Sequence, residues 1–93
     1  MAEAMARVAT VNASRYLQQL CKHWAHKLDV TFTPEEGTVS FAKAVAVMRA
    51  EPEVLVVTIT ADDPAVLERM KGVVASHLDR FAFKEAPLGF DWS

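Results

Sequence analysis

The stretch that decides the fold is VLVVTITADDP, residues 54–64, because it holds the clearest strand and the clearest helix start in the chain. Val54 to Ala61 is rich in β-branched residues, with alternate large apolar side chains on one side, which predicts a strand. Asp63 followed by Pro64 is typical of a helix start, since aspartate is a good N-cap and proline fits the first helical position. The sequence therefore predicts a strand that leads directly into a helix.

Two amphipathic helices are predicted, one before this strand and one after it. The first begins after an N-cap at Asn12 or Thr10 and ends near His26, and the second runs from Pro64 to about Phe81. In both segments apolar residues recur at intervals of three and four, which places them on one stripe of a helix. Each helix is therefore expected to bury one side only.

Further strands are predicted from alternating apolar and polar residues. Residues 6–10 form a short candidate strand, residues 28–33 alternate with a period of two, and residues 39–47 do so except at Lys43. A bulge or a second turn near Ala42 to Ala44 explains that exception. The strand count stays open at this point of the chain.

Turn residues separate these segments. Pro34-Glu35-Glu36-Gly37 predicts a hairpin loop in which Gly37 takes a positive φ. Pro87 ends the helical pattern, and the alternating residues 88–92 that follow it predict an edge strand.

We therefore predict an α+β fold, a two-layer sandwich with an antiparallel sheet of about four strands and two helices on one face. Strands joined by tight turns run antiparallel, and two helices with one apolar side each need one face of that sheet to cover them. The predicted order is β-α-β-β-β-α. A ferredoxin-like or a TATA-box-protein-like topology is the nearest known shape.

Length and composition predict a single domain over residues 1–93. The chain is 52% apolar and 24% charged, and it has no apolar run long enough to span a membrane. Its net charge is −2, so no overall positive potential attracts nucleic acid. The first residues do not resemble a signal peptide, and the lone Cys21 agrees with a reducing compartment, so we expect a cytoplasmic protein.

The three histidines are the candidate functional residues, because histidine titrates near neutrality and readily binds metals. On the first helix His23 lies at the edge of the apolar stripe, and His26 lies farther round on the solvent side. On the second helix His77 lies inside the apolar stripe. Cys21 points nearly opposite to His23, so a local Cys/His metal site on the first helix is geometrically poor.

If the helices lie side by side, His23 and His77 face one another across a groove. This arrangement predicts a small-ligand site formed by Tyr16, His23, His77 and Phe81. It also predicts a metal site that uses His23, His26 and His77, since side chains three apart share one helical surface. The alternative is a packing role, in which His77 is satisfied by a backbone carbonyl or a Tyr hydroxyl and His26 is simply solvated.

The two histidine segments resemble a small bacterial family, domain of unknown function 2218. The resemblance extends over nearly the whole chain, and it rests on Ala9, Tyr16-Leu17, Leu20 to Lys27, Glu36-Gly37, His77 to Phe83 and Trp92. It implies an α+β domain that some relatives join to, or encode beside, siderophore-interacting proteins of iron uptake. It assigns no role to His23, His26 or His77, although all three match its pattern. Ala42-Lys43-Ala44 departs from the pattern, which has a glycine-containing turn there.

Two functions follow as hypotheses. The first is a non-enzymatic accessory module that binds a metal ion, a ferric chelate or a small anionic ligand, with a homodimer covering the sheet edges. The second is a small lyase or aldolase-like enzyme in which His23 or His77 serves as acid/base or metal ligand. An aldolase label is carried by some relatives, but metal-dependent aldolases of that kind resemble (β/α)₈ barrels of roughly 250 residues, which this chain cannot build.

Overall fold

The computed structural model describes residues 2–82, 89, 90, 92 and 93 of the chain. Over these residues it has five strands and two helices. In chain order they are β1 (Ala2–Ala9), α1 (Ala13–Trp24), β2 (Asp29–Phe32), β3 (Glu36–Ser40), β4 (Ala44–Glu51), β5 (Val54–Ala61) and α2 (Pro64–Phe81).

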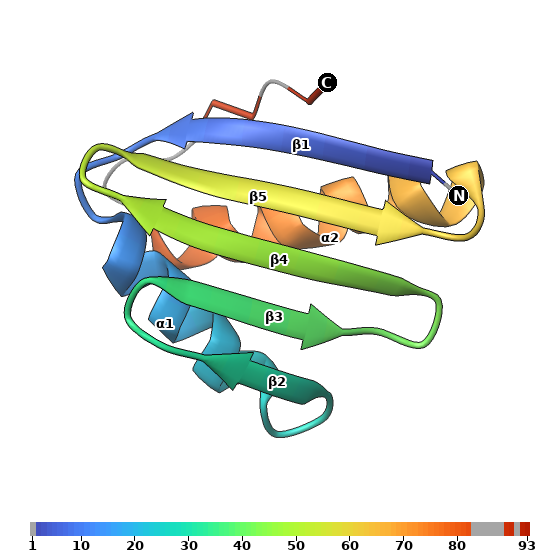
Figure 1. Ribbon diagram of the computed structural model, residues 1–93, viewed down its shortest axis with the longest axis horizontal. Coiled ribbons are helices and arrows are strands. Elements are labelled where there is room, and N and C mark those ends of the chain that lie inside the picture. Colours follow the sequence, from blue (N-terminus) through green and yellow to red (C-terminus); the bar gives the residue numbers. More distant parts are fainter. Residues whose placement is uncertain (1, 83–88, 91) are drawn as a thin grey trace.

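The strands form one antiparallel sheet in the order β1-β5-β4-β3-β2, and both helices cover the same face of it (Figure 1). Strands β2 to β5 are joined by hairpins, so each pairs with its neighbour in sequence. Strand β1 pairs with β5 along its whole length, from Ala2 opposite Ala61 to Ala9 opposite Val54. This is the predicted two-layer α+β sandwich, and α2 packs mainly on β5 and β1 while α1 packs mainly on β4 and β3.

The sheet has one apolar face and one mixed face, because buried and exposed residues alternate along β1 and β4. The face under the helices carries fully buried side chains such as Val8, Met48 and Ile59. The opposite face carries Val45 and Val47, which are 38% and 40% exposed, beside charged and threonine residues. Antiparallel sheets commonly keep one solvated face in this way.

Helix α2 begins where the sequence predicted a helix start. The Asp63 carboxylate accepts a hydrogen bond of 2.7 Å from the Ala65 backbone N–H, and Pro64 occupies the first helical position. Asn12 is the N-cap residue of α1, but its side chain makes no capping bond. An Asx or Ser/Thr cap typically stabilises a helix by about 1 kcal/mol, so α1 depends more than α2 on its packing.

The prediction of about four strands is wrong, because residues 39–47 belong to two strands. Strand β3 ends at Ser40 and β4 begins at Ala44, with the Phe41 N–H donating to the Ala44 carbonyl across the turn. Lys43 is therefore a turn residue. The observed order β-α-β-β-β-β-α also differs from the ferredoxin-like order, in which each half of the chain is a β-α-β unit. The TATA-box-protein-like shape stays a prediction.

Other boundaries also differ from the prediction, and β1 covers Ala2–Ala9 rather than residues 6–10. Helix α1 ends at Trp24, so His26 lies beyond it. Gly37 lies inside β3 rather than in the hairpin loop, and its missing side chain leaves room for α1. A Cβ atom at this position would lie 2.6 Å from Cys21 Sγ and 3.3 Å from a Leu17 methyl carbon. This glycine is required by close packing between helix and sheet.

The end of the chain lies beside the outer edge of β1 (Figure 1). Met5 and Ser93 exchange two backbone hydrogen bonds, of 3.1 and 2.9 Å, and the rings of Phe90 and Trp92 stack with their centroids 5.7 Å apart. The edge strand predicted for residues 88–92 falls in part outside the described residues. No helix in the described part of the chain is both long and apolar enough to span a membrane.

Candidate functional site

The two histidine segments meet where the last turn of α1 lies against the second half of α2. His23 is exposed on α1 and His77 is half-buried on α2. Their ring centroids are 5.5 Å apart and the ring planes are tilted by 47°. The structure therefore places the two rings as neighbours across the helix contact, as the helical positions predicted.

The His77 ring is held by the backbone of its own helix. Its Nδ1 lies 2.7 Å from the Val73 carbonyl oxygen. Because a carbonyl oxygen can only accept, Nδ1 must carry the hydrogen, and in the neutral ring Nε2 keeps its lone pair. Histidines that ligate metals usually have this arrangement, with one ring nitrogen donating to a carbonyl or carboxylate.

Aromatic rings surround the histidine pair. Trp24 lies 5.2 Å from His77 and 5.1 Å from Phe41, and Phe81 lies 5.8 Å from His23, all between ring centroids. Trp24 is buried, whereas Phe41 and Phe81 are half-buried. We call these five residues the histidine–aromatic cluster: His23, Trp24, Phe41, His77 and Phe81. It combines two ring nitrogens that accept a metal or a proton with apolar surface for an organic group.

The other predicted site residues lie elsewhere. Tyr16 is only 6% exposed and belongs to the core, about 10 Å from His23 along α1 at 1.5 Å per residue. Its hydroxyl accepts a hydrogen bond of 3.5 Å from the Asn12 amide. His26 lines a hollow of about 460 Å³ that shares Phe41, but neither His23 nor His77, with the cluster. Within the described part of the chain, no three His, Cys, Asp or Glu side chains gather closely enough to hold a metal ion.

Cys21 is enclosed by the core and does not contribute to the cluster. It is fully buried under Gly37, and burial raises the pKa of its thiol from 9.0 to about 11. Since the thiolate is the nucleophilic and metal-binding form, this cysteine is a packing residue.

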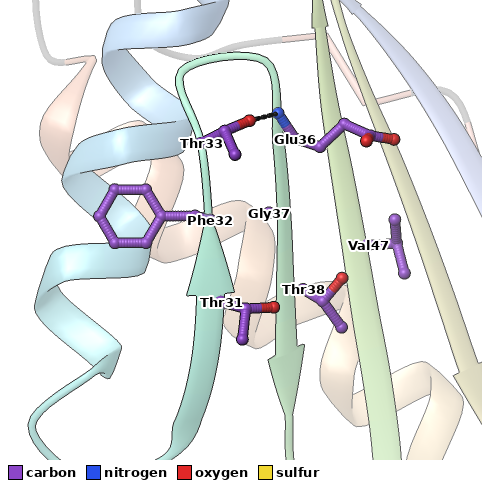
Figure 2. Close-up of a pocket in the computed structure, with 7 residues that line it drawn as sticks. All are labelled: Thr31, Phe32, Thr33, Glu36, Gly37, Thr38 and Val47. Atoms are coloured by element: carbon purple, nitrogen blue, oxygen red, sulfur yellow. Dashed lines mark hydrogen bonds between the residues drawn. The ribbon is translucent and has the colours of Figure 1, made fainter.

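A shallow hollow of about 290 Å³ lies at the β2–β3–β4 side of the sheet, and no sequence pattern predicted it. Figure 2 shows Thr31, Thr38 and Val47 side by side across three strands, with Phe32 pointing away toward α1. The Thr33 hydroxyl accepts hydrogen bonds from the Glu35 and Glu36 N–H groups and fixes the turn above it. The lining of this hollow has one ionisable side chain, Glu36, whereas the histidine–aromatic cluster has two imidazole rings.

The fold and the cluster define a small two-layer α+β protein with a histidine pair between its helices. Residues 5–93 match the model of a family described as an uncharacterized protein conserved in bacteria, domain of unknown function 2218. The chain belongs to this family, as its histidine segments suggested.

A solved structure supports the fold. The NMR structure of PA4090 from Pseudomonas aeruginosa is 35% identical in sequence, with a TM-score of 0.85 over 100% of this chain and 96% of that one. A search of curated proteins found no match.

Proposed function

We propose that the protein is a non-enzymatic module that binds a metal ion or a metal chelate at the histidine–aromatic cluster. The observation that carries this proposal is the approach of His23 and His77 to a ring distance of 5.5 Å from two different helices. Imidazole is a preferred ligand of zinc, copper, iron and nickel. The bond from His77 Nδ1 to the Val73 carbonyl presents Nε2 as the ligating atom.

Two imidazoles fill only part of a coordination sphere, which favours a chelate over a bare ion. The described residues add no third ligand at the pair. A chelator brings its own donor atoms, and its organic part can pack on the rings of Trp24 and Phe81. The family resemblance implies that some relatives are joined to, or encoded beside, siderophore-interacting proteins of iron uptake, and this makes a ferric chelate the first candidate.

The test is isothermal titration of the protein with Zn²⁺, with Fe³⁺ held soluble by citrate, and with a ferric trihydroxamate. We expect binding at micromolar or lower concentration that His23→Ala and His77→Ala each weaken by at least tenfold. His26→Ala is the matched control, because this histidine is exposed three residues from His23 and lies outside the cluster. Equal losses in all three variants, or no binding by the unmodified protein, would contradict the proposal.

A further inference from the structure

Another hollow lies between the β3–β4 turn and the first turns of α2, and the histidine proposal does not involve it. Its volume of about 520 Å³ lies within the range of roughly 300–1,000 Å³ that is typical of small-molecule sites. It shares only Phe41 with the histidine–aromatic cluster. The two sites can therefore be tested separately.

The floor of this hollow is apolar. Val66 and Met70 lie four residues apart on α2, so both face the same side of the helix, and Phe41 faces them from the β3–β4 turn. The Phe41 ring also contacts the ring of Trp24, and the two ring centroids are 5.1 Å apart. The floor thus presents a ring and two aliphatic side chains to a ligand.

Two cations line the same hollow. Lys43 comes from the turn and Arg69 from α2, and both side chains are exposed. Among the described residues neither takes part in an ion pair. Asp63 is the acidic residue of the lining, and its Oδ1 is occupied by the N-cap bond to Ala65. The lining therefore carries two positive charges against one negative charge.

We infer that this hollow binds an organic acid, a small carboxylate with an aromatic or aliphatic body. The body packs on Phe41, Val66 and Met70, and the carboxylate lies between Lys43 and Arg69. An inorganic anion would leave the apolar floor in water, and a neutral apolar compound would leave both cations unused. Only a ligand with both parts satisfies the whole lining.

The test is a titration of ¹⁵N-labelled protein with 3-phenylpropanoate, followed by backbone amide shifts. The matched probes are 3-phenylpropanamide, which lacks the charge, and inorganic phosphate, which lacks the apolar body. We expect the carboxylate to shift amides of the β3–β4 turn and the start of α2, and to bind at least fivefold more tightly than either probe. Equal affinity for carboxylate and amide, or shifts located elsewhere, would overturn the inference.

Three variants test the assignment of residues. Lys43→Gln and Arg69→Gln should each weaken carboxylate binding by about three- to fivefold, as for other exposed ion pairs, and leave amide binding unchanged. Arg80→Gln is the control, because Arg80 is exposed on the same helix about 16 Å farther along and does not line the hollow. Ala65→Phe fills the hollow from an exposed position and should abolish binding of both compounds. Carboxylate binding that survives Ala65→Phe would contradict the inference.

Discussion

Helix α1 meets two different surroundings. On the side of the sheet the helix packs closely, since the side chains of Cys21 and Leu17 leave no room for a Cβ atom at Gly37. Toward α2 its last turn carries the exposed His23, which meets His77 among aromatic rings. The first contact uses the cysteine as a small apolar side chain, whereas the second brings together an exposed and a half-buried imidazole ring. Cys21 therefore serves packing, whereas His23 and His77 are the residues that we propose to bind a ligand.

The largest effect expected from this comparison is on the sheet side. Gly37→Ala should lower the free energy of unfolding by about 1–3 kcal/mol, because the new Cβ would lie 2.6 Å from Cys21 Sγ. Gly72→Ala is the matched control, since a Cβ at this exposed helical position meets nothing within 4 Å. It should raise stability by about 0.4–1 kcal/mol. Urea unfolding of both variants measures the difference, and equal effects would refute the close-packing account.

The double variant Gly37→Ala/Cys21→Ala tests the contact between these two residues directly. Cys21→Ala removes the sulfur that the new Cβ would meet, so adding it to Gly37→Ala should cost less than the sum of the two single changes. An interaction free energy of about 0.5–3 kcal/mol is typical for residues in contact. Strict additivity of the two changes would show that Cys21 does not set the spacing between α1 and β3.

Burial of Cys21 makes the stability of the protein depend on pH in the alkaline range. Burial raises the pKa of the Cys21 thiol above its unfolded value of 9.0, to about 11, so the folded state favours the neutral thiol. This stabilisation is fully present below pH 9 and is lost as the pH rises from 9 toward 11. The melting temperature of the unmodified protein should therefore fall more steeply over this range than that of Cys21→Ala. Parallel curves would contradict the assignment.

Much of the secondary structure could be predicted from the sequence, because it depends on local patterns. The apolar stripes of both helices, the alternation of the strands and the pair Asp63-Pro64 are signals within a few residues of each other. For two helices lying side by side, the helical positions also predicted that His23 and His77 would face each other.

The parts that sequence reasoning missed depend on contacts between distant residues. The split between β3 and β4 was left open between a bulge and a second turn, because Lys43 alone interrupts the alternation and this turn contains no glycine. Gly37 looked like a turn residue because nothing local shows that Cys21 lies above it. Tyr16 was predicted to line the groove but is buried, whereas Trp24, which was not among the predicted site residues, contacts the His77 ring.

The smallest effects on stability are expected at the histidine–aromatic cluster. His77→Ala should cost about 1 kcal/mol, because it removes ring contacts with Trp24 and the bond to the Val73 carbonyl. His23→Ala and His26→Ala should each stay within about 0.5 kcal/mol, since both side chains are exposed. Thermal unfolding of the three variants checks this order. A cost above about 3 kcal/mol for His23 would show that the pair serves packing rather than binding.

The most direct test of the histidine site is an NMR spectrum that correlates the imidazole nitrogens with the ring protons during titration with Zn²⁺ and with a ferric trihydroxamate. Before addition, His77 should show a protonated Nδ1, as its bond to Val73 requires. On addition, the signals of His23 and His77 should change together with one dissociation constant, while those of His26 stay in place. A response shared equally by His26, or no response of His23 and His77 to either ligand, would contradict the proposed site.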